Sequence, residues 1–363
     1  MNVSLVTDPR RDDYTGVLAR RYGGDPFFVH PDIGFLSRVL DARSAFLARG
    51  KARAFAVRDG SARPVAFAVA FVDPGLQSKT GAATGSIGFF EALDEPGARA
   101  VLDAACTWLA ALGVTEVWAP FNANPYNRMG AREDHFDEPA FIGCAHDPPT
   151  TRDFLLAAGF ELVNRYLNFA IDLAARPWQG VETVVAGVEF RGVSRLHFRR
   201  EVLSYVRLHN AAFRSVWGEV EISEAEALQM LMRSRLAVEP RLFRFAVVDG
   251  ADVGFVLCMP DLNAVLAPLH VPLTSLRGVA RIVRARRRAR GVGLLSLAVA
   301  PEHQGRGIGT ALVGAACRAA AERGSTAFEY ALVAENNGPS KATAARFGGT
   351  PCRRFGIYRR TLA

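Results

Sequence analysis

The sequence has few cysteines and no long apolar run. Its five cysteines among 363 residues are scattered, without a C-x-x-C pair or a metal-ligand spacing, which favours a reducing, cytoplasmic setting over a disulfide-stabilised secreted fold. No segment approaches the roughly 20 apolar residues of a membrane-spanning helix, and no basic segment with an apolar core opens the chain. We therefore expect no membrane partner. The seven histidines are dispersed, and we assign none of them to a metal.

An internal repeat accounts for the length of the chain. The pattern at 55–60 and 64–72 predicts a hairpin, and the same pattern recurs at 245–250 and 253–259. The repeat continues in the elements predicted next, namely helix 98–112 and strand 116–120 in the first copy, and helix 310–323 and strand 327–334 in the second. A chain of this length, half of it hydrophobic, can bury two cores.

The repeat predicts a first domain at 1–175, a linker at 176–187 and a second domain at 188–363. Each copy carries one insertion, the first between Asn122 and Gly159 and the second between Pro260 and Leu294. The first insertion is polar and rich in proline, and long loops of this kind are often functional. It is interpreted either as a wall of an acceptor site or as a surface loop that packs the two domains together.

A buried strand, a glycine-rich turn and a helix follow one another from Leu294. The apolar run 294–300 predicts the strand, which Pro301 ends, and the Ala-rich stretch after Thr310 predicts the helix. The turn between them, Gln304-Gly305-Arg306-Gly307-Ile308-Gly309, contains three glycines. Backbone N–H groups can therefore approach an anion at a helix N-terminus. The turn lacks the Lys-Ser/Thr ending of a nucleotide P-loop, and no acidic residue follows at the distance of a dinucleotide fold.

This turn resembles the acyl-CoA pyrophosphate loop of the GCN5-related N-acetyltransferase (GNAT) superfamily, whose pattern Gln/Arg-x-x-Gly-x-Gly/Ala is matched by Gln304, Gly307 and Gly309. The order of elements downstream, as far as a closing strand with Tyr358, is also similar. The resemblance implies an acyl-CoA co-substrate, acetyl-CoA or a longer acyl-CoA, and no metal. The residues that it implies for donor binding are Leu297, Ala298, Val299, Gln304, Gly305, Arg306, Gly307, Ile308, Gly309, Thr310 and Asn337.

With the repeat, the resemblance extends to nearly the whole chain. It implies an α/β fold of two tandem GNAT-like domains, each a mixed sheet with splayed fourth and fifth strands flanked by helices. Phe136-Asp137-Glu138-Pro139 and Pro260-Asp261-Leu262-Asn263 match motifs of a bacterial group of tandem proteins. Asp147-Pro148-Pro149-Thr150-Thr151 departs from that group's Asn-Pro-Pro-Tyr-Tyr, so an aromatic wall of a possible pocket is missing. In the first copy, residues 89–97 are too short and too acidic to hold a pyrophosphate.

The resemblance also implies the reaction, in which a neutral amine attacks a thioester held between the splayed strands. A backbone N–H near Val299 would polarise the carbonyl, while a base takes the ammonium proton and an acid protonates the sulfur. Many members carry the acid as a tyrosine at the position of Ala344. The remaining candidates are Tyr358 as the acid and Glu329 and Glu335 as bases. A core position for the tyrosine, and strand-end caps or ion pairs for the glutamates, are the competing interpretations.

An arginine-rich segment leads into the donor strand. No acidic residue occurs from Leu262 to Pro301. At helical spacing one face carries Arg277, Arg281, Arg284 and Arg288, and an apolar stripe carries Leu276, Val279 and Val283. A solvated basic helix is the simplest interpretation. The alternatives are contacts with the 3′-phosphate of CoA, with an acidic acyl carrier protein or with RNA, and the net charge of +8 fits all three.

We expect an acyl-CoA-dependent N-acyltransferase that acylates the amine of a small metabolite or an amino-acid-like acceptor. One alternative is an acyl carrier protein donor docked on the Arg277–Arg290 helix. Others are a non-catalytic acyl-CoA-binding protein and a tRNA-linked tandem GNAT protein. The intact turn at Gln304–Gly309 argues against the tRNA-linked protein, and no aromatic residues are interleaved with the arginines. We therefore expect no nucleic-acid partner.

Overall fold

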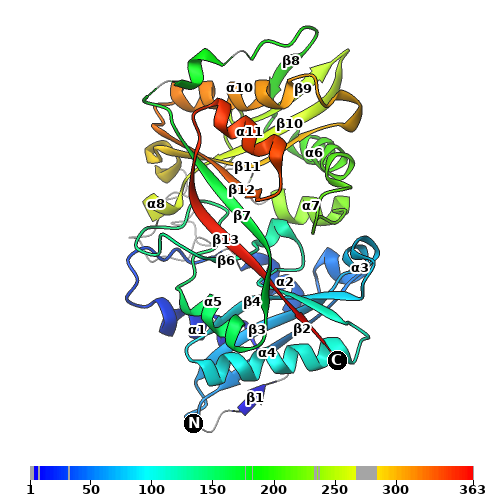
Figure 1. Ribbon diagram of the computed structural model, residues 1–363, viewed down its shortest axis with the longest axis vertical. Coiled ribbons are helices and arrows are strands. Elements are labelled where there is room, and N and C mark those ends of the chain that lie inside the picture. The colour runs from blue at the N-terminus through cyan, green and yellow to red at the C-terminus, as the bar shows by residue number, and fades with distance from the viewer. Residues whose placement is uncertain are drawn as a thin grey trace.

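The computed structural model describes residues 4–362, except 7–8, 32, 176, 182, 233–234, 236–237 and 267–283. Within these residues the chain forms one continuous sheet of thirteen strands, with helices packed on both faces (Figure 1). This mixed architecture confirms the α/β fold class predicted from the sequence. None of the described helices is long and apolar enough to cross a membrane.

The two halves of the chain repeat one order of elements: a strand, two helices, a hairpin, a strand, a helix, a strand, a helix and a strand. The first half contains β1 (Ser4–Val6), α1 (Arg11–Tyr22), α2 (Gly34–Leu40), η1 (Ala45–Ala48), β2 (Lys51–Arg58), β3 (Pro64–Val72), α3 (Pro74–Thr80), β4 (Thr84–Ala92), α4 (Glu95–Ala110), β5 (Glu116–Ala119), η2 (Pro125–Asn127), β6 (Ala131–Arg132), α5 (Thr150–Ala157) and β7 (Glu161–Asp172). After η3 (Pro177–Gly180), the second half contains β8 (Glu189–Gly192), α6 (Phe198–Phe213), α7 (Glu224–Leu231), β9 (Phe243–Val248), β10 (Ala251–Pro260), α8 (Asn263–Leu266), β11 (Gly291–Val299), η6 (Pro301–His303), α10 (Ile308–Glu322), β12 (Ala327–Ala334), α11 (Gly338–Arg346) and β13 (Thr350–Thr361).

The last strands of the two halves are exchanged. The main path of the sheet runs β1-β2-β3-β4-β5-β13-β7-β12-β11-β10-β9-β8, with β6 paired to β13. Thus β7 of the first half pairs with β12 of the second, and β13 of the second half pairs with β5 of the first. The two exchanged strands also pair with each other, from Thr350 opposite Ala170 to Arg359 opposite Glu161. They are the long ribbons that cross the middle of Figure 1, and each half completes the sheet of the other.

Each half buries one core on either face of its part of the sheet. In the first half, α4 covers one face through residues such as Leu102, and α1 covers the other through Val17. In the second half, α10 covers one face through Leu312, and α6 covers the other through Val202. Apolar side chains at helical spacing form these buried stripes. The sheet therefore separates an α10 side from an α6 side in the second half.

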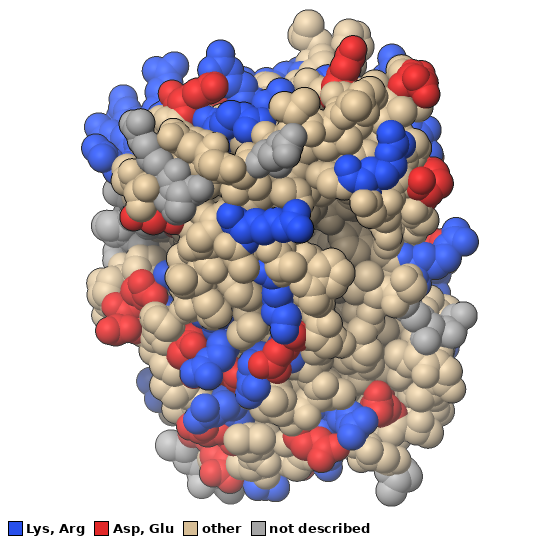
Figure 2. Space-filling model, turned by 45° about the horizontal axis from the view of Figure 1, so that its top comes forward, with Lys and Arg blue, Asp and Glu red and all other residues tan. Residues whose placement is uncertain are grey.

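The described part of the arginine-rich segment is a short basic helix that precedes β11 in the chain. Residues 284–288 are helical, with Ala285 buried and Arg284, Arg287 and Arg288 exposed. The predicted positions of Arg277 and Arg281, and of Leu276, Val279 and Val283, lie outside the described residues. Lys and Arg side chains gather along the upper part of the face in Figure 2, and a hollow opens just right of its centre.

Candidate active site

The glycine turn joins β11 to α10 and is open to solvent. Gly305 and Gly307 adopt left-handed backbone conformations, with φ of 75° and 79°, which cost other residues about 1–2 kcal/mol each. Gln304, Gly305, Arg306 and Gly307 are exposed, whereas Ile308 is buried and anchors the start of the helix. The first N–H groups of an α-helix have no partner within it, and they carry the positive end of its dipole. The turn therefore presents donors that suit a pyrophosphate.

Side-chain contacts hold the turn against β11 and η6. Gln304 donates from Nε2 to the carbonyl oxygen of Val299 at 3.0 Å, and Arg306 Nη1 lies 3.0 Å from Nδ1 of His303. A Cβ atom added to Gly307 would meet only Val185, at 3.9 Å. A side chain there would therefore point into open space in front of the helix, where an anion has to approach. The structure places all of the residues predicted from Gln304 to Thr310 around this one helix end.

The two central strands of the second half separate beyond Leu294. In the described chain, the parallel pairing of β11 with β12 runs from Gly291 opposite Ala327 to Leu294 opposite Tyr330 and goes no further. A bulge at the same point interrupts the pairing of β11 with β10 between Leu257 and Cys258. The edge of β11 that faces β12 is therefore open along its last residues. Leu297, Ala298 and Val299 lie on this segment, and their backbone groups on that edge are placed for hydrogen bonds to a ligand.

The last residues of β11 alternate between the two faces of the sheet. Leu297 and Val299 pack with the α10 core, and Ala298 and Ala300 pack with the α6 core. Ser296 also faces α6, because it is close enough to Tyr205 to lower the pKa of that phenol. This alternation is the period of two expected for a strand. A donor on the α10 side and an acceptor on the α6 side can therefore meet at the gap between β11 and β12.

Glu329 lies in a buried network within the paired part of β12. Its carboxylate accepts hydrogen bonds from Asn168, at 2.5 Å, and from Arg353. Burial raises the pKa of this carboxyl, and Arg353 opposes the shift. Asn168 also accepts a hydrogen bond from the backbone N–H of Leu332, at 2.7 Å, where β12 bulges. Glu329 lies opposite Gly293, before the strands separate. Because Asn168 belongs to β7 and Arg353 to β13, the two hydrogen bonds of Glu329 tie β12 to both exchanged strands.

Tyr358 and Glu335 belong to one chain of contacts at the junction of the halves. The hydroxyl of Tyr358 donates to Glu133 at 2.9 Å, Arg165 binds the other oxygen of Glu133 at 2.7 Å, and Arg165 lies 3.6 Å from Glu335. Burial and the neighbouring Glu133 raise the pKa of Tyr358 above its usual range. Tyr358, on β13, lies opposite Ala119 of β5 and packs in the core of the first half. The strand exchange thus carries this tyrosine away from the glycine turn.

Asn337 caps the helix that follows the second splayed strand. Its side-chain oxygen accepts the backbone N–H of Ser340 at 3.1 Å, at the start of α11. Ala344 is fully buried on the same helix. The hydroxyl of Tyr330 donates to Ser340 at 3.2 Å, and burial raises the pKa of that phenol to about 12. The predicted donor-binding residue Asn337 therefore shapes the end of β12 through the helix that it caps.

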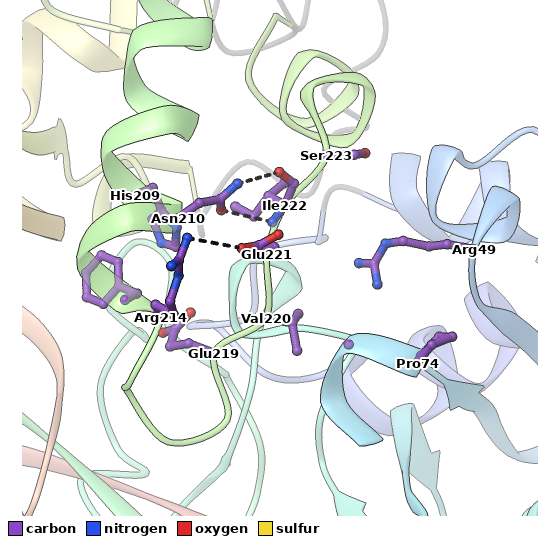
Figure 3. Close-up of a pocket in the computed structure, with 12 residues that line it drawn as sticks. Arg49, Pro74, His209, Asn210, Arg214, Glu219, Val220, Glu221, Ile222 and Ser223 are labelled. Atoms are coloured by element: carbon purple, nitrogen blue, oxygen red, sulfur yellow. Dashed lines mark hydrogen bonds and ion pairs between the residues drawn. The ribbon is translucent and has the colours of Figure 1, made fainter. Parts of the chain in front are cut away.

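A cavity of about 540 Å³ lies between α6 and the first half. Its walls come from the end of α6, from the 219–223 segment, and from Arg49, Pro74 and Gly75 of the first half. In Figure 3, Arg49 reaches toward the cavity from one side and His209, Asn210 and Glu221 lie on the other. The size is typical of small-molecule sites. Both halves of the chain are needed to form it.

Three polar side chains that meet beside this cavity belong to no sequence motif. Tyr126 donates a hydrogen bond to the carboxylate of Glu219, and its hydroxyl lies 3.5 Å from Nδ1 of His209. The rings of Tyr126 and His209 meet edge to face, 4.7 Å apart. Neither Glu219 nor His209 was predicted as a site residue. The one available signal was the position of Tyr126 in the first insertion.

The first insertion packs the two halves together, which is one of the two roles that its sequence left open. Tyr126 donates to Glu219, which lines the cavity. Ile142 and Ala140 are held by the second half: Asp261 accepts the backbone N–H of Ile142 at 3.2 Å, and Asn263 donates to the carbonyl oxygen of Ala140 at 2.9 Å. Burial raises the pKa of Asp261 to about 6. The Pro260–Asn263 motif therefore binds the first half to the second through these hydrogen bonds.

The first half keeps the splayed strands but not the glycine turn. Its parallel pairing of β4 with β5 runs only from Thr84 to Ser86, and a cavity of about 290 Å³ lies beyond it. Glu91 lines this cavity, and burial raises its pKa to about 7. At the start of α4, however, the side chain of Asp94 accepts the N–H of Gly97 at 2.8 Å. A carboxylate thus occupies the helix end that α10 leaves open for an anion.

Comparisons with known proteins agree with this geometry. Residues 204–348 match the model of the Acetyltransferase (GNAT) family. The chain is 25% identical over 299 residues to a protein of Caulobacter vibrioides named bacterial ceramide synthase, covering 79% of this chain and 77% of that protein. It is also 25% identical over 305 residues to protein YghO of Escherichia coli, covering 80% and 77% of the two chains. Among the described residues, no three His, Cys, Asp or Glu side chains are grouped to hold a metal ion.

Solved structures with the same fold cover almost the entire chain. A tandem GNAT protein from the clavulanic acid biosynthesis pathway superposes with a TM-score of 0.60 at 18% identity, covering 99% of this chain and 98% of that one. A GCN5-related N-acetyltransferase from Sphaerobacter thermophilus gives a TM-score of 0.54 at 15% identity, covering 99% and 95%. These likenesses concern the fold alone. The family match lies in the second half, at residues 204–348, and the fold of the whole chain is that of a tandem GNAT protein.

Proposed function

We propose that the protein is an acyl-CoA-dependent N-acyltransferase, which transfers the acyl group to the amine of a small metabolite or an amino-acid-like acceptor. The observation that carries the proposal is the exposed glycine turn at the start of α10, directly beside the open edge of β11. Backbone N–H groups from Gly305 to Thr310 would hold the pyrophosphate. The end of β11, from Leu297 to Val299, would pair with the amide-containing arm of the donor.

Bound acyl-CoA would supply a thioester carbonyl at the gap between β11 and β12. The chain would orient that carbonyl through backbone N–H groups of β11 near Val299, while Ile308 and the α10 core exclude water behind it. Tyr358, Glu329 and Glu335 remain the acid and base candidates proposed from the resemblance. An amine acceptor is supported by the Caulobacter relative, because a ceramide synthase forms an amide.

The proposal is tested by donor binding and by product formation. Titration calorimetry with acetyl-CoA and octanoyl-CoA should show one site per chain, because only the second half has the glycine turn. Incubation with primary amines should then release one CoA thiol for each amide that mass spectrometry detects. Two equivalent sites, or amide formation without acyl-CoA binding, would contradict the assignment of the donor site.

An acyl carrier protein is a second candidate donor, favoured by one observation. Arg284, Arg287, Arg288 and Arg290 are exposed immediately before β11, so an acidic carrier could dock where its prosthetic arm enters the open strand edge. Oppositely charged surfaces steer such encounters, and salt screens them over about 8–10 Å at physiological ionic strength.

Charge reversal distinguishes the two donors. Arg284→Glu, Arg287→Glu and Arg288→Glu together should lower kcat/KM for a carrier-protein donor by about tenfold or more at low salt, and much less at high salt. Free acetyl-CoA should change little unless an arginine holds the 3′-phosphate, which a parallel measurement with 3′-dephospho-CoA reveals. Arg63, Arg99 and Arg152 of the first half are exposed as well, and their change to Glu is the control with equal net charge. Equal losses in both triple variants would refute specific docking.

A further inference from the structure

Glu219 lies in the segment between α6 and α7, and its carboxylate accepts a hydrogen bond from Tyr126. Burial raises the pKa values of Tyr126, Tyr205 and Tyr166, and in each case the nearby Glu219 adds to the shift. One of these phenols, Tyr205, lies near Ser296 on β11, which lowers its pKa. Another, Tyr166, is the register partner of Ala334 at the end of β12. Tyr126, which donates to Glu219, also packs against the core that contains Ala298 and Ala300 at the end of β11.

The surroundings of Glu219 are suited to handling a proton. The phenol of Tyr126 donates to Glu219, and the imidazole of His209 lies against the rings of both Tyr126 and Tyr205. Tyr126 directs its O–H at the carboxylate, which fixes one oxygen in place. Glu219 is only half-buried and lines the cavity between α6 and the first half, so a ligand in that cavity can touch it.

We propose that this cavity is the acceptor site and that Glu219 is the catalytic base, positioned by Tyr126 of the first half. The assignment rests on the proposed N-acyltransferase function. A proton passes from the acceptor ammonium to the Glu219 carboxylate, and the neutral nitrogen attacks the thioester carbon. The C–N bond forms as the C–S bond breaks, and CoA leaves as a thiol that carries the second N–H proton. The acceptor enters from the α6 side and the donor from the α10 side.

Two acceptors of matched shape separate proton removal from every other role of Glu219. At pH 7 n-butylamine is an ammonium ion, whereas O-propylhydroxylamine, with an oxygen in place of the methylene beside the nitrogen, is already uncharged. With acetyl-CoA as donor, Glu219→Gln should lower kcat/KM for n-butylamine by about 100-fold or more, the range of general-base contributions. The loss for O-propylhydroxylamine should be less than about tenfold. Tyr126→Phe should shift the ratio of the two acceptors in the same direction by a smaller factor.

Glu224→Gln is the matched control, because Glu224 is an exposed glutamate in the first turn of α7 and should leave both rates unchanged. Calorimetry with acetyl-CoA shows whether each variant keeps its donor site. Equal losses for the two acceptors, or full activity in Glu219→Gln, would overturn the assignment of Glu219 while the donor site stands. Failure of the parent chain to bind acetyl-CoA would instead overturn the proposed function.

Discussion

Replacing Gly307 with glutamate is expected to abolish acyl-CoA binding. Gly307 is the N-cap of α10 with φ of 79°, so any side chain there adds strain of about 1–2 kcal/mol. The new side chain would also point into the open space where the pyrophosphate approaches, and its carboxylate would oppose both the phosphates and the helix dipole. Affinity for acetyl-CoA in titration calorimetry should fall on the order of 100-fold or more.

A control for backbone strain exists on the same helix. Gly324 follows α10 with φ of 83°, and a Cβ there would meet no atom within 4 Å. Gly324→Glu should therefore cost similar stability in a thermal melt and leave the affinity for acetyl-CoA unchanged. If Gly307→Glu binds acetyl-CoA as tightly as the parent chain, the glycine turn does not hold the donor.

The glycine turn could be predicted because its determinants are contiguous. An apolar strand, three glycines and an alanine-rich helix follow one another within 294–323, and each local preference agrees with the final backbone. The repeat was equally visible, since periodicity and turn residues recur in the same order. Both features depend on neighbours in the sequence, and pattern arguments describe such neighbours well.

The strand exchange could not be predicted, and the repeat itself is the reason. β7 and β13 hold the same place in their halves, so either of them satisfies the side-chain pattern that β5 or β12 requires. The alternation of apolar and polar residues along the two strands is the same for pairing within a half and for pairing across the halves. The choice matters for Tyr358, because β13 places it beside Ala119 of the first half. Its proposed role as an acid thus depends on a pairing that no motif records.

The acceptor-side group is assembled from residues that are distant in the sequence. Tyr126, His209 and Glu219 come from an insertion, a helix and a loop, and single tyrosine, histidine and glutamate residues occur throughout the chain. Only the packing of the first insertion against α6 brings them together. Sequence spacing therefore identifies the glycine turn more readily than this group of polar side chains.

A chain that begins at Val188 is expected to be insoluble or to lose acetyl-CoA binding. Such a fragment keeps the glycine turn but lacks β7, which lies between β12 and β13 in the sheet. The fragment leaves the edge of β12 that faces β7 unpaired. It also lacks β5, β6 and β7, which are the strands that pair with β13. Exposed ladder edges and uncovered apolar faces promote aggregation.

Supplying the missing half as a second chain is the matching control. Residues 1–187 and 188–363, coexpressed, contain every strand of the continuous sheet, because the cut falls before β8 and outside the exchanged pairs. The two fragments should copurify as a one-to-one complex and regain acetyl-CoA affinity in calorimetry. A soluble 188–363 fragment that binds acetyl-CoA as the full chain does would show that the second half folds without β7. The strand exchange would then join two halves that fold independently. The first half would be needed only to supply Tyr126 and its side of the acceptor cavity.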